Sequence, residues 1–92
     1  MPRHRKDVMA SLEKKGFVAS EGDHTYYCYY TMDKKKTFAK TKVSHSGKDI
    51  ADNILNRMAH QCKLTQVQFR DLVDCPLSRE EYEKILRAHG FA

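Results

Sequence analysis

The spacing of apolar residues changes along the chain and separates helical from extended segments. Val8, Met9 and Leu12 fall on one helical stripe, and Gly16 follows where a helix would end. The pattern predicts a first helix within residues 6–16.

Three extended segments follow this helix. Residues 17–21 (FVASE) predict a short strand, and residues 22–23 a turn. Residues 24–32 (HTYYCYYTM) are rich in tyrosine, which favours strands. Residues 33–35 make the next turn, and residues 36–43 (KTFAKTKV) alternate small or apolar side chains with lysines and a phenylalanine. The alternation predicts a half-buried strand that shows its lysines to solvent.

From Lys48 onward the apolar period is helical. The recurring positions are Ile50, Ile54, Leu55, Met58 and Cys62. They predict a long second helix. Thr65 with Gln68, and Ser78 with Glu81, have the capping-box pattern and predict two further short helices. Residues 1–92 should therefore form one α+β domain.

Which side of the tyrosine-rich strand is buried depends on the turn that follows it. Side chains alternate along a strand. One face takes His24, Tyr26, Cys28 and Tyr30, and the other takes Thr25, Tyr27, Tyr29 and Thr31. A two-residue turn at residues 33–34 would pair Tyr30 with Thr37 and turn His24 toward the buried side of the next strand.

A three-residue turn over residues 33–35 gives the opposite result. It pairs Tyr30 with Phe38 and Tyr26 with Lys42, so that the histidine joins the lysines on the open face. We favour this register because it keeps the small side chains of residues 36–43 from facing the bulkier set. Neither turn contains the glycine that would fix its type.

Charge is distributed unevenly along the chain. The net charge is +5, but residues 1–48 hold eleven Lys or Arg and five Asp or Glu, whereas residues 49–92 hold six and seven. A positive face attracts phosphate polymers, and anionic membranes nearly as well. It is also compatible with a solvated face that has no partner.

Cysteine use and hydropathy bear on location. The three cysteines are widely spaced, with no CxxC pair, which indicates free thiols. No apolar run exceeds five residues, far short of the roughly 20 that a spanning helix needs. We expect a soluble cytoplasmic protein with no membrane partner.

The favoured open face has side chains suited to RNA. Tyr26 can stack on an unpaired base, and Lys36, Lys40 and Lys42 can neutralise phosphates. The imidazole of His24 can take the proton of a ribose 2′-hydroxyl. Purely structural explanations of these residues remain open: a lone histidine often has a structural role, and the tyrosines of a strand often serve packing alone.

Metal chemistry has no support in the sequence. The carboxylates are scattered, and His60 and Cys62, two apart on a helix, face different directions. We expect no metal and no cofactor.

Four short segments form a pattern that is typical of a known family. The first is "LEKKGF" at the end of the first helix. The second is Gly22-Asp23-His24 before a tyrosine-rich strand. The third and fourth are Val43-Ser44-His45 and then Lys48-Asp49-Ile50. With these motifs in this order, roughly residues 6–58 resemble the HicA toxins, which cleave RNA and pair with HicB antitoxins.

The resemblance implies a fold, an activity and a partner. The fold would be an αβββα core like that of double-stranded-RNA-binding domains, over residues 6–58, with a helical extension over residues 59–92. The activity would be metal-independent cleavage of messenger RNA with His24 as the catalytic base or acid, and the partner a HicB-like antitoxin. The chain departs from the family in three ways: Asp23 replaces a serine, Ser44 replaces a proline, and the extension is added.

Two alternative functions remain open on the same fold. One is a non-catalytic RNA- or DNA-binding domain in which His24 only stacks or hydrogen-bonds. The other is an interaction module whose basic face meets an acidic protein. The extension itself could cap the helical side of the sheet, stand in for an antitoxin surface or form a dimer contact.

Overall fold

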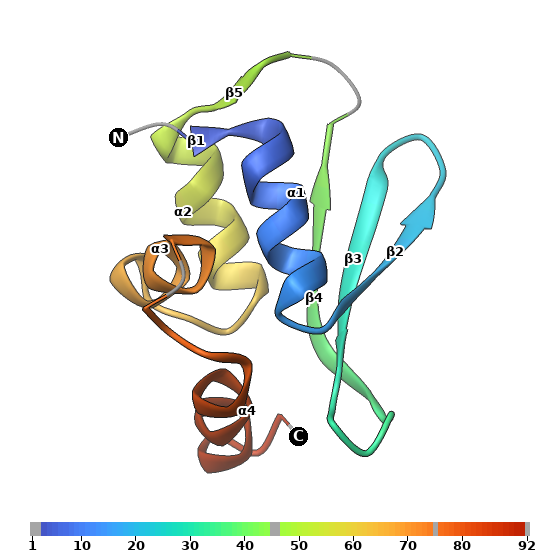
Figure 1. Cartoon of the computed structure of the whole chain (residues 1–92), viewed down its shortest axis with the longest axis vertical. Coiled ribbons are helices and arrows are strands. Elements are labelled where there is room, and N and C mark those ends of the chain that lie inside the picture. The colour runs from blue at the N-terminus through green and yellow to red at the C-terminus, as the bar shows by residue number, and fades with distance from the viewer. Residues whose placement is uncertain (1–2, 45–46, 75, 92) are drawn as a thin grey trace.

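The chain folds as an α+β protein in a computed structural model that describes residues 3–44, 47–74 and 76–91. Within these residues, a three-stranded antiparallel sheet and four helices form most of the structure (Figure 1). The elements are β1 (Arg3–His4), α1 (Arg5–Lys14), β2 (Phe17–Glu21), β3 (Thr25–Tyr30), β4 (Lys36–Val43), β5 (Asp49–Ile50), α2 (Asp52–Gln61), α3 (Gln66–Asp74) and α4 (Arg79–Ala88).

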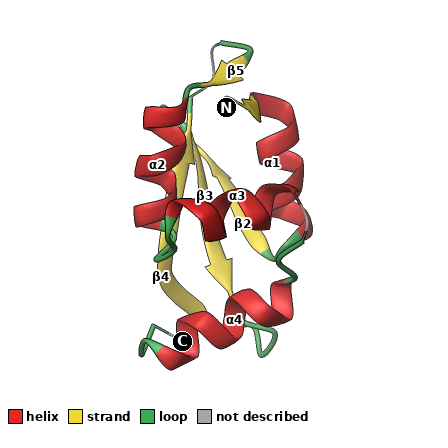
Figure 2. Cartoon of the chain, turned by 90° about the vertical axis from the view of Figure 1, so that its left-hand side faces the viewer, coloured by secondary structure: helices red, strands yellow, loops and turns green. Residues whose placement is uncertain are grey.

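The helices gather on one face of the main sheet. The strand order is β2-β3-β4, with β3 at the centre. Helices α1 and α2 lie against the sheet and α3 packs on both of them, whereas α4 lies at one end of the sheet (Figure 2). The opposite face of the sheet has no helix over it among the described residues.

Alternation along β3 decides which tyrosines enter the core. Tyr27 and Tyr29 point toward the helices and are fully buried, as is Ala39 on β4. Tyr26 and Tyr30 point the other way and are half-buried. The predicted division of the two faces is therefore confirmed, and β4 has the predicted bounds.

The predicted register is right at one end of the β3–β4 hairpin and wrong at the other. Tyr26 pairs with Lys42 as expected, but Tyr30 pairs with Lys36 rather than Phe38. A bulge in between absorbs the difference. The side chain of Thr37 stabilises it, because its Oγ1 donates to the Tyr29 carbonyl at 2.8 Å and accepts from the backbone of the bulged strand.

The turn of this hairpin lies one residue earlier than predicted. Thr31 N–H donates to the Lys35 carbonyl at 2.9 Å, so the connecting residues are 32–34. Lys34 takes the left-handed backbone conformation, with φ 66°, in the absence of a glycine. The Thr31 hydroxyl supports the turn by accepting from Lys35 N–H at 3.0 Å.

A two-stranded pairing near the N-terminus was not predicted. β1 pairs with β5, which keeps Ile50 in an extended conformation and buries it. Helix α2 therefore begins at Asp52, later than the helical period suggested. Arg3 is held by two hydrogen bonds to Asp74 at 2.8 and 2.9 Å.

The two C-terminal helices begin at the predicted capping boxes. Thr65 and Gln68 exchange reciprocal bonds at 3.0 and 3.1 Å before α3, and Ser78 Oγ accepts from Glu81 N–H before α4. Both helices contribute to the same core as the sheet. The fully buried residues among them are Phe69, Leu72, Tyr82 and Leu86.

The structure bears on the expected free thiols and on the expected lack of a membrane-spanning helix. Cys28 and Cys62 are buried free cysteines, and Cys75 lies outside the described residues. No helix in the described ranges is long and apolar enough to cross a membrane.

Glu83 of α4 is a buried carboxylate that ties the helix to the sheet. Only 2% of its surface is exposed. It accepts from the Tyr29 hydroxyl at 2.6 Å and from Met32 N–H at 2.8 Å, and it pairs with Arg87 at 2.7 Å. Burial raises the pKa of the Glu83 carboxyl, but the three donors together lower it by more than burial raises it. The pKa therefore lies below its ordinary value.

Replacing Glu83 by Gln should lower the free energy of unfolding at pH 7 by about 1–3 kcal/mol, because the charged partner of three donors is lost. Since the folded-state pKa is lowered, the contribution of Glu83 is present above its ordinary pKa. It is lost as the pH falls through the folded-state value. Urea unfolding at pH 7 and pH 3 measures both effects.

The exposed Glu80 of the same helix provides the control. The Glu80→Gln variant should have the same midpoint urea concentration of unfolding as the wild type at both pH values. Equal midpoints for Glu83→Gln and Glu80→Gln at pH 7 would contradict the assigned role.

Candidate nucleic-acid interface

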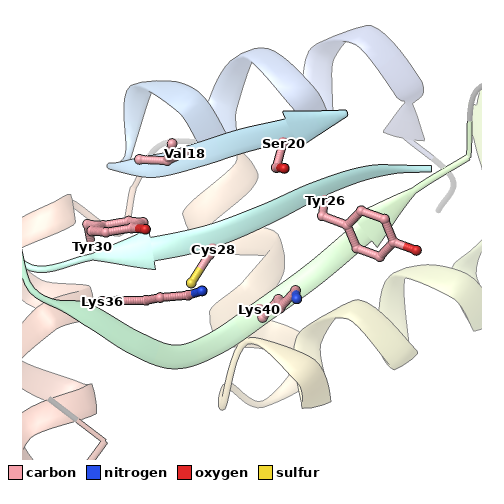
Figure 3. Close-up of a pocket in the computed structure, with 7 residues that line it drawn as sticks. All are labelled: Val18, Ser20, Tyr26, Cys28, Tyr30, Lys36 and Lys40. Atoms are coloured by element: carbon pink, nitrogen blue, oxygen red, sulfur yellow. The ribbon is translucent and has the colours of Figure 1, made fainter. Parts of the chain in front are cut away.

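The open face of the sheet is hollowed between two tyrosines. The hollow has a volume of about 250 Å³. Its lining residues are Val18 and Ser20 of β2, Tyr26, Cys28 and Tyr30 of β3, and Lys36 and Lys40 of β4 (Figure 3). Tyr26 and Tyr30 lie at opposite ends of it, with Cys28 between them. All three strands of the sheet thus contribute to one concave surface.

Tyr26 is where the aromatic and basic side chains meet. The Lys40 ammonium lies 5.4 Å from the centre of the Tyr26 ring, within the range of a cation–π interaction. Lys42 is the cross-strand partner of Tyr26. A second hollow, of about 260 Å³, is bordered by these three residues together with Gln61 of α2. Two lysines therefore flank a ring that has one edge in solvent.

His24 directly precedes β3, beside Tyr26. The two ring centres are 6.3 Å apart. The His24 Nδ1 atom is buried and lies 3.6 Å from Asp23 Oδ2. The side chain as a whole is 36% exposed, so part of it is in contact with solvent beside Tyr26.

Asp23 connects His24 with Tyr26. Its Oδ1 accepts from the Tyr26 hydroxyl at 2.7 Å and from His24 N–H at 3.1 Å. The hydrogen bond from Tyr26 lowers the pKa of Asp23, and the nearby histidine lowers it further. The same hydrogen bond raises the pKa of Tyr26. At neutral pH the cluster holds a carboxylate and a protonated phenol.

Not all the predicted site residues come together. His24, Tyr26, Lys40 and Lys42 form one group at the β2–β3 end of the sheet. Lys36 lines the hollow at its other end, beside Tyr30. Six residue steps of about 3.3 Å along β3 place that end roughly 20 Å from His24. His45, part of the family-like pattern, lies outside the described residues.

Sequence reasoning missed the contribution of β2 to this surface. Val18 and Ser20 border the hollow because they share a face with Cys28 and Tyr26, their cross-strand partners. The alternation of residues 17–21 contained this signal. Pairing with the central strand was needed to say which face each residue takes.

The arrangement of His, Cys, Asp and Glu side chains bears on metal binding. Within residues 3–44, 47–74 and 76–91, no three His, Cys, Asp or Glu side chains lie close enough together to hold a metal ion. His60 is exposed and Cys62 is buried, so these two helix residues do face different directions.

Comparison with known proteins returns no match to this chain among family models, curated proteins or solved structures.

Replacing Asp23 by Asn should bring the pKa of the Tyr26 phenol down toward its ordinary value, because the charged acceptor that favours the protonated form is lost. NMR titration of tyrosine labelled at Cζ measures this. Tyr27 is the internal control: burial and the adjacent Glu13 raise the pKa of its phenol to about 12, and that value should not move. An unchanged Tyr26 titration would contradict the hydrogen bond to Asp23.

Proposed function

We propose that this protein is a metal-independent endoribonuclease that binds unpaired RNA on its open sheet face. The observation that carries the proposal is the His24–Asp23–Tyr26 cluster, which adjoins Lys40 and Lys42 on a concave surface. The HicA-like pattern of the sequence supports the same activity, with a HicB-like protein as a possible partner in the cytoplasm.

The arrangement of elements is compatible with this proposal. Helices α1 and α2 pack on one face of a β2-β3-β4 sheet, in the αβββα order expected of a core like that of double-stranded-RNA-binding domains. Here, the aromatic and basic side chains proposed to bind RNA lie on the sheet face. Aromatic rings on a sheet favour unpaired bases, since a paired base cannot reach them.

Binding would use two kinds of contact. A base stacks on the solvent-facing part of the Tyr26 ring, and Lys40 and Lys42 contact the phosphates on either side of it. Stacking on tyrosine accepts any base, so this part of the site selects for single strands rather than for a sequence.

Cleavage would proceed by attack of the ribose on its own phosphate. A ring nitrogen of His24 accepts the proton of the 2′-hydroxyl, and the Asp23 carboxylate, 3.6 Å from Nδ1, favours the imidazolium that forms. The 2′-oxygen bonds to phosphorus, and the bond from phosphorus to the 5′-oxygen breaks. The leaving oxygen takes a proton from a second group, and Tyr26 and the lysines of β4 are the candidates for it. The products are a 2′,3′-cyclic phosphate and a 5′-hydroxyl.

The lysines would stabilise the transition state as well as the complex. Negative charge builds up on the non-bridging oxygens as the 2′-oxygen attacks, and ammonium groups close to them lower the barrier. This role requires no metal ion.

The deciding experiment is cleavage of an unstructured RNA by the purified protein in excess EDTA. His24→Ala should lower the cleavage rate about 10²- to 10⁴-fold, since the general base is lost. Wild-type products should end in 2′,3′-cyclic phosphate. The exposed His60, on α2, supplies the matched control, and His60→Ala should cut at the wild-type rate.

The lysine pair is tested by binding rather than by cleavage. In a His24→Ala background, Lys40→Ala/Lys42→Ala should reduce the slope of log affinity against log salt by about 1.4, because two phosphate contacts are lost. Lys6→Ala/Lys84→Ala removes the same charge from exposed helix positions and should leave the slope unchanged.

Two outcomes would contradict parts of the proposal. RNA binding without any cutting by the wild type would leave the protein a binding domain and His24 a structural residue. Salt-sensitive binding that does not distinguish RNA from other polyanions would favour an acidic protein as the partner of this face.

A further inference from the structure

A further hollow lies where the β3–β4 turn meets the C-terminal end of α4. Its volume is about 440 Å³, and its lining includes Lys35, Lys36, Phe38, Arg87 and Phe91. Lys36 borders both this hollow and the one on the open sheet face. The two concave surfaces are therefore joined at a lysine.

Phe38 is the most exposed large apolar side chain among those described, with 78% of its surface in solvent. It lies within the bulge of β4, between Lys36 and Lys40 in sequence. Bulges change the direction of a side chain relative to the ladder. Phe38 has left its expected position opposite Tyr30 and instead lines the hollow beside α4.

The charges around Phe38 are mostly positive. Arg87 is paired with Glu83 at 2.7 Å and with Asp33 at 3.7 Å, so its charge is largely balanced within the protein. Lys35 and Lys36 are exposed and supply the net positive charge of this hollow. An aromatic ring between ammonium groups is the combination that binds an unpaired nucleotide: the ring takes the base and the lysines take the phosphate.

We propose that Phe38 and Lys36 form a second nucleotide subsite for the RNA that the open face binds. This inference rests on the proposed function. The subsite takes an unpaired base on the Phe38 ring, at the end of the sheet roughly 20 Å from His24, by six steps of about 3.3 Å along β3. It therefore contacts RNA several nucleotides away from the scissile phosphate, and it contributes affinity rather than chemistry.

The test compares fluorescein-labelled oligouridine RNAs of 4 and 12 nucleotides in a His24→Ala background, with fluorescence anisotropy as the readout. Phe38→Ala should weaken binding of the longer RNA about five-fold or more, because base stacking on one ring is lost. Binding of the shorter RNA, which occupies only the His24 end, should not change. Phe38→Trp keeps a stacking surface and should retain the affinity.

Val67 supplies the matched control, since it is 69% exposed on α3, away from both hollows. Val67→Ala should bind both RNAs as the His24→Ala parent does. Equal affinity of Phe38→Ala and the parent for the longer RNA would overturn the subsite but leave the proposed function standing. The subsite would also be overturned if Phe38→Trp weakened RNA binding as much as Phe38→Ala does. The same holds if Val67→Ala weakened binding as much as Phe38→Ala does. If neither the wild type nor the parent binds RNA, the proposed function fails and the subsite fails with it.

Discussion

The burial of Tyr27 and Tyr29 is the interaction on which the rest of this structure depends. Both rings are fully enclosed between the central strand and the helices, where Tyr29 meets Phe17 and Tyr82 edge-on at 5.5 and 4.9 Å. Each aromatic ring buries a large apolar area, so these contacts fix which face of β3 is the core. Alternation then forces the neighbouring tyrosines onto the opposite face. The candidate site is thus a consequence of how the core is packed.

The open face combines fixed and adaptable parts. Asp23 accepts a hydrogen bond from the Tyr26 phenol and lies 3.6 Å from the His24 imidazole, so that three polar side chains meet next to the β2–β3 turn. The exposed lysines of β4 extend into solvent. A hydrogen-bonded tyrosine and flexible positive charges thus share the open face, as the proposed function requires.

The C-terminal helices have a structural role and also shape the surface. Their apolar side chains belong to the common core, with α3 packed on α1 and α2 and α4 at one end of the sheet. Glu83 connects α4 to the hydroxyl of Tyr29 and to the backbone of the β3–β4 turn. Through this contact the end of α4, with Phe91, borders the hollow that Phe38 enters.

The class of fold, the order of the main elements and the division of β3 into two faces follow from the sequence alone, because the periods of 2 and 3.6 are local properties. The sequence also indicated His24 and Lys40 as candidates for one surface. The bulge that moves Phe38 depends instead on tertiary contacts, since the Thr37 hydroxyl donates to the Tyr29 carbonyl of the neighbouring strand there. The role of Glu83 also depends on tertiary contacts. In the sequence it resembles an ordinary residue of a helix surface, but in the structure its carboxylate accepts hydrogen bonds from the Tyr29 hydroxyl and Met32 N–H. Contacts between residues far apart in the chain leave no periodic signal in the sequence.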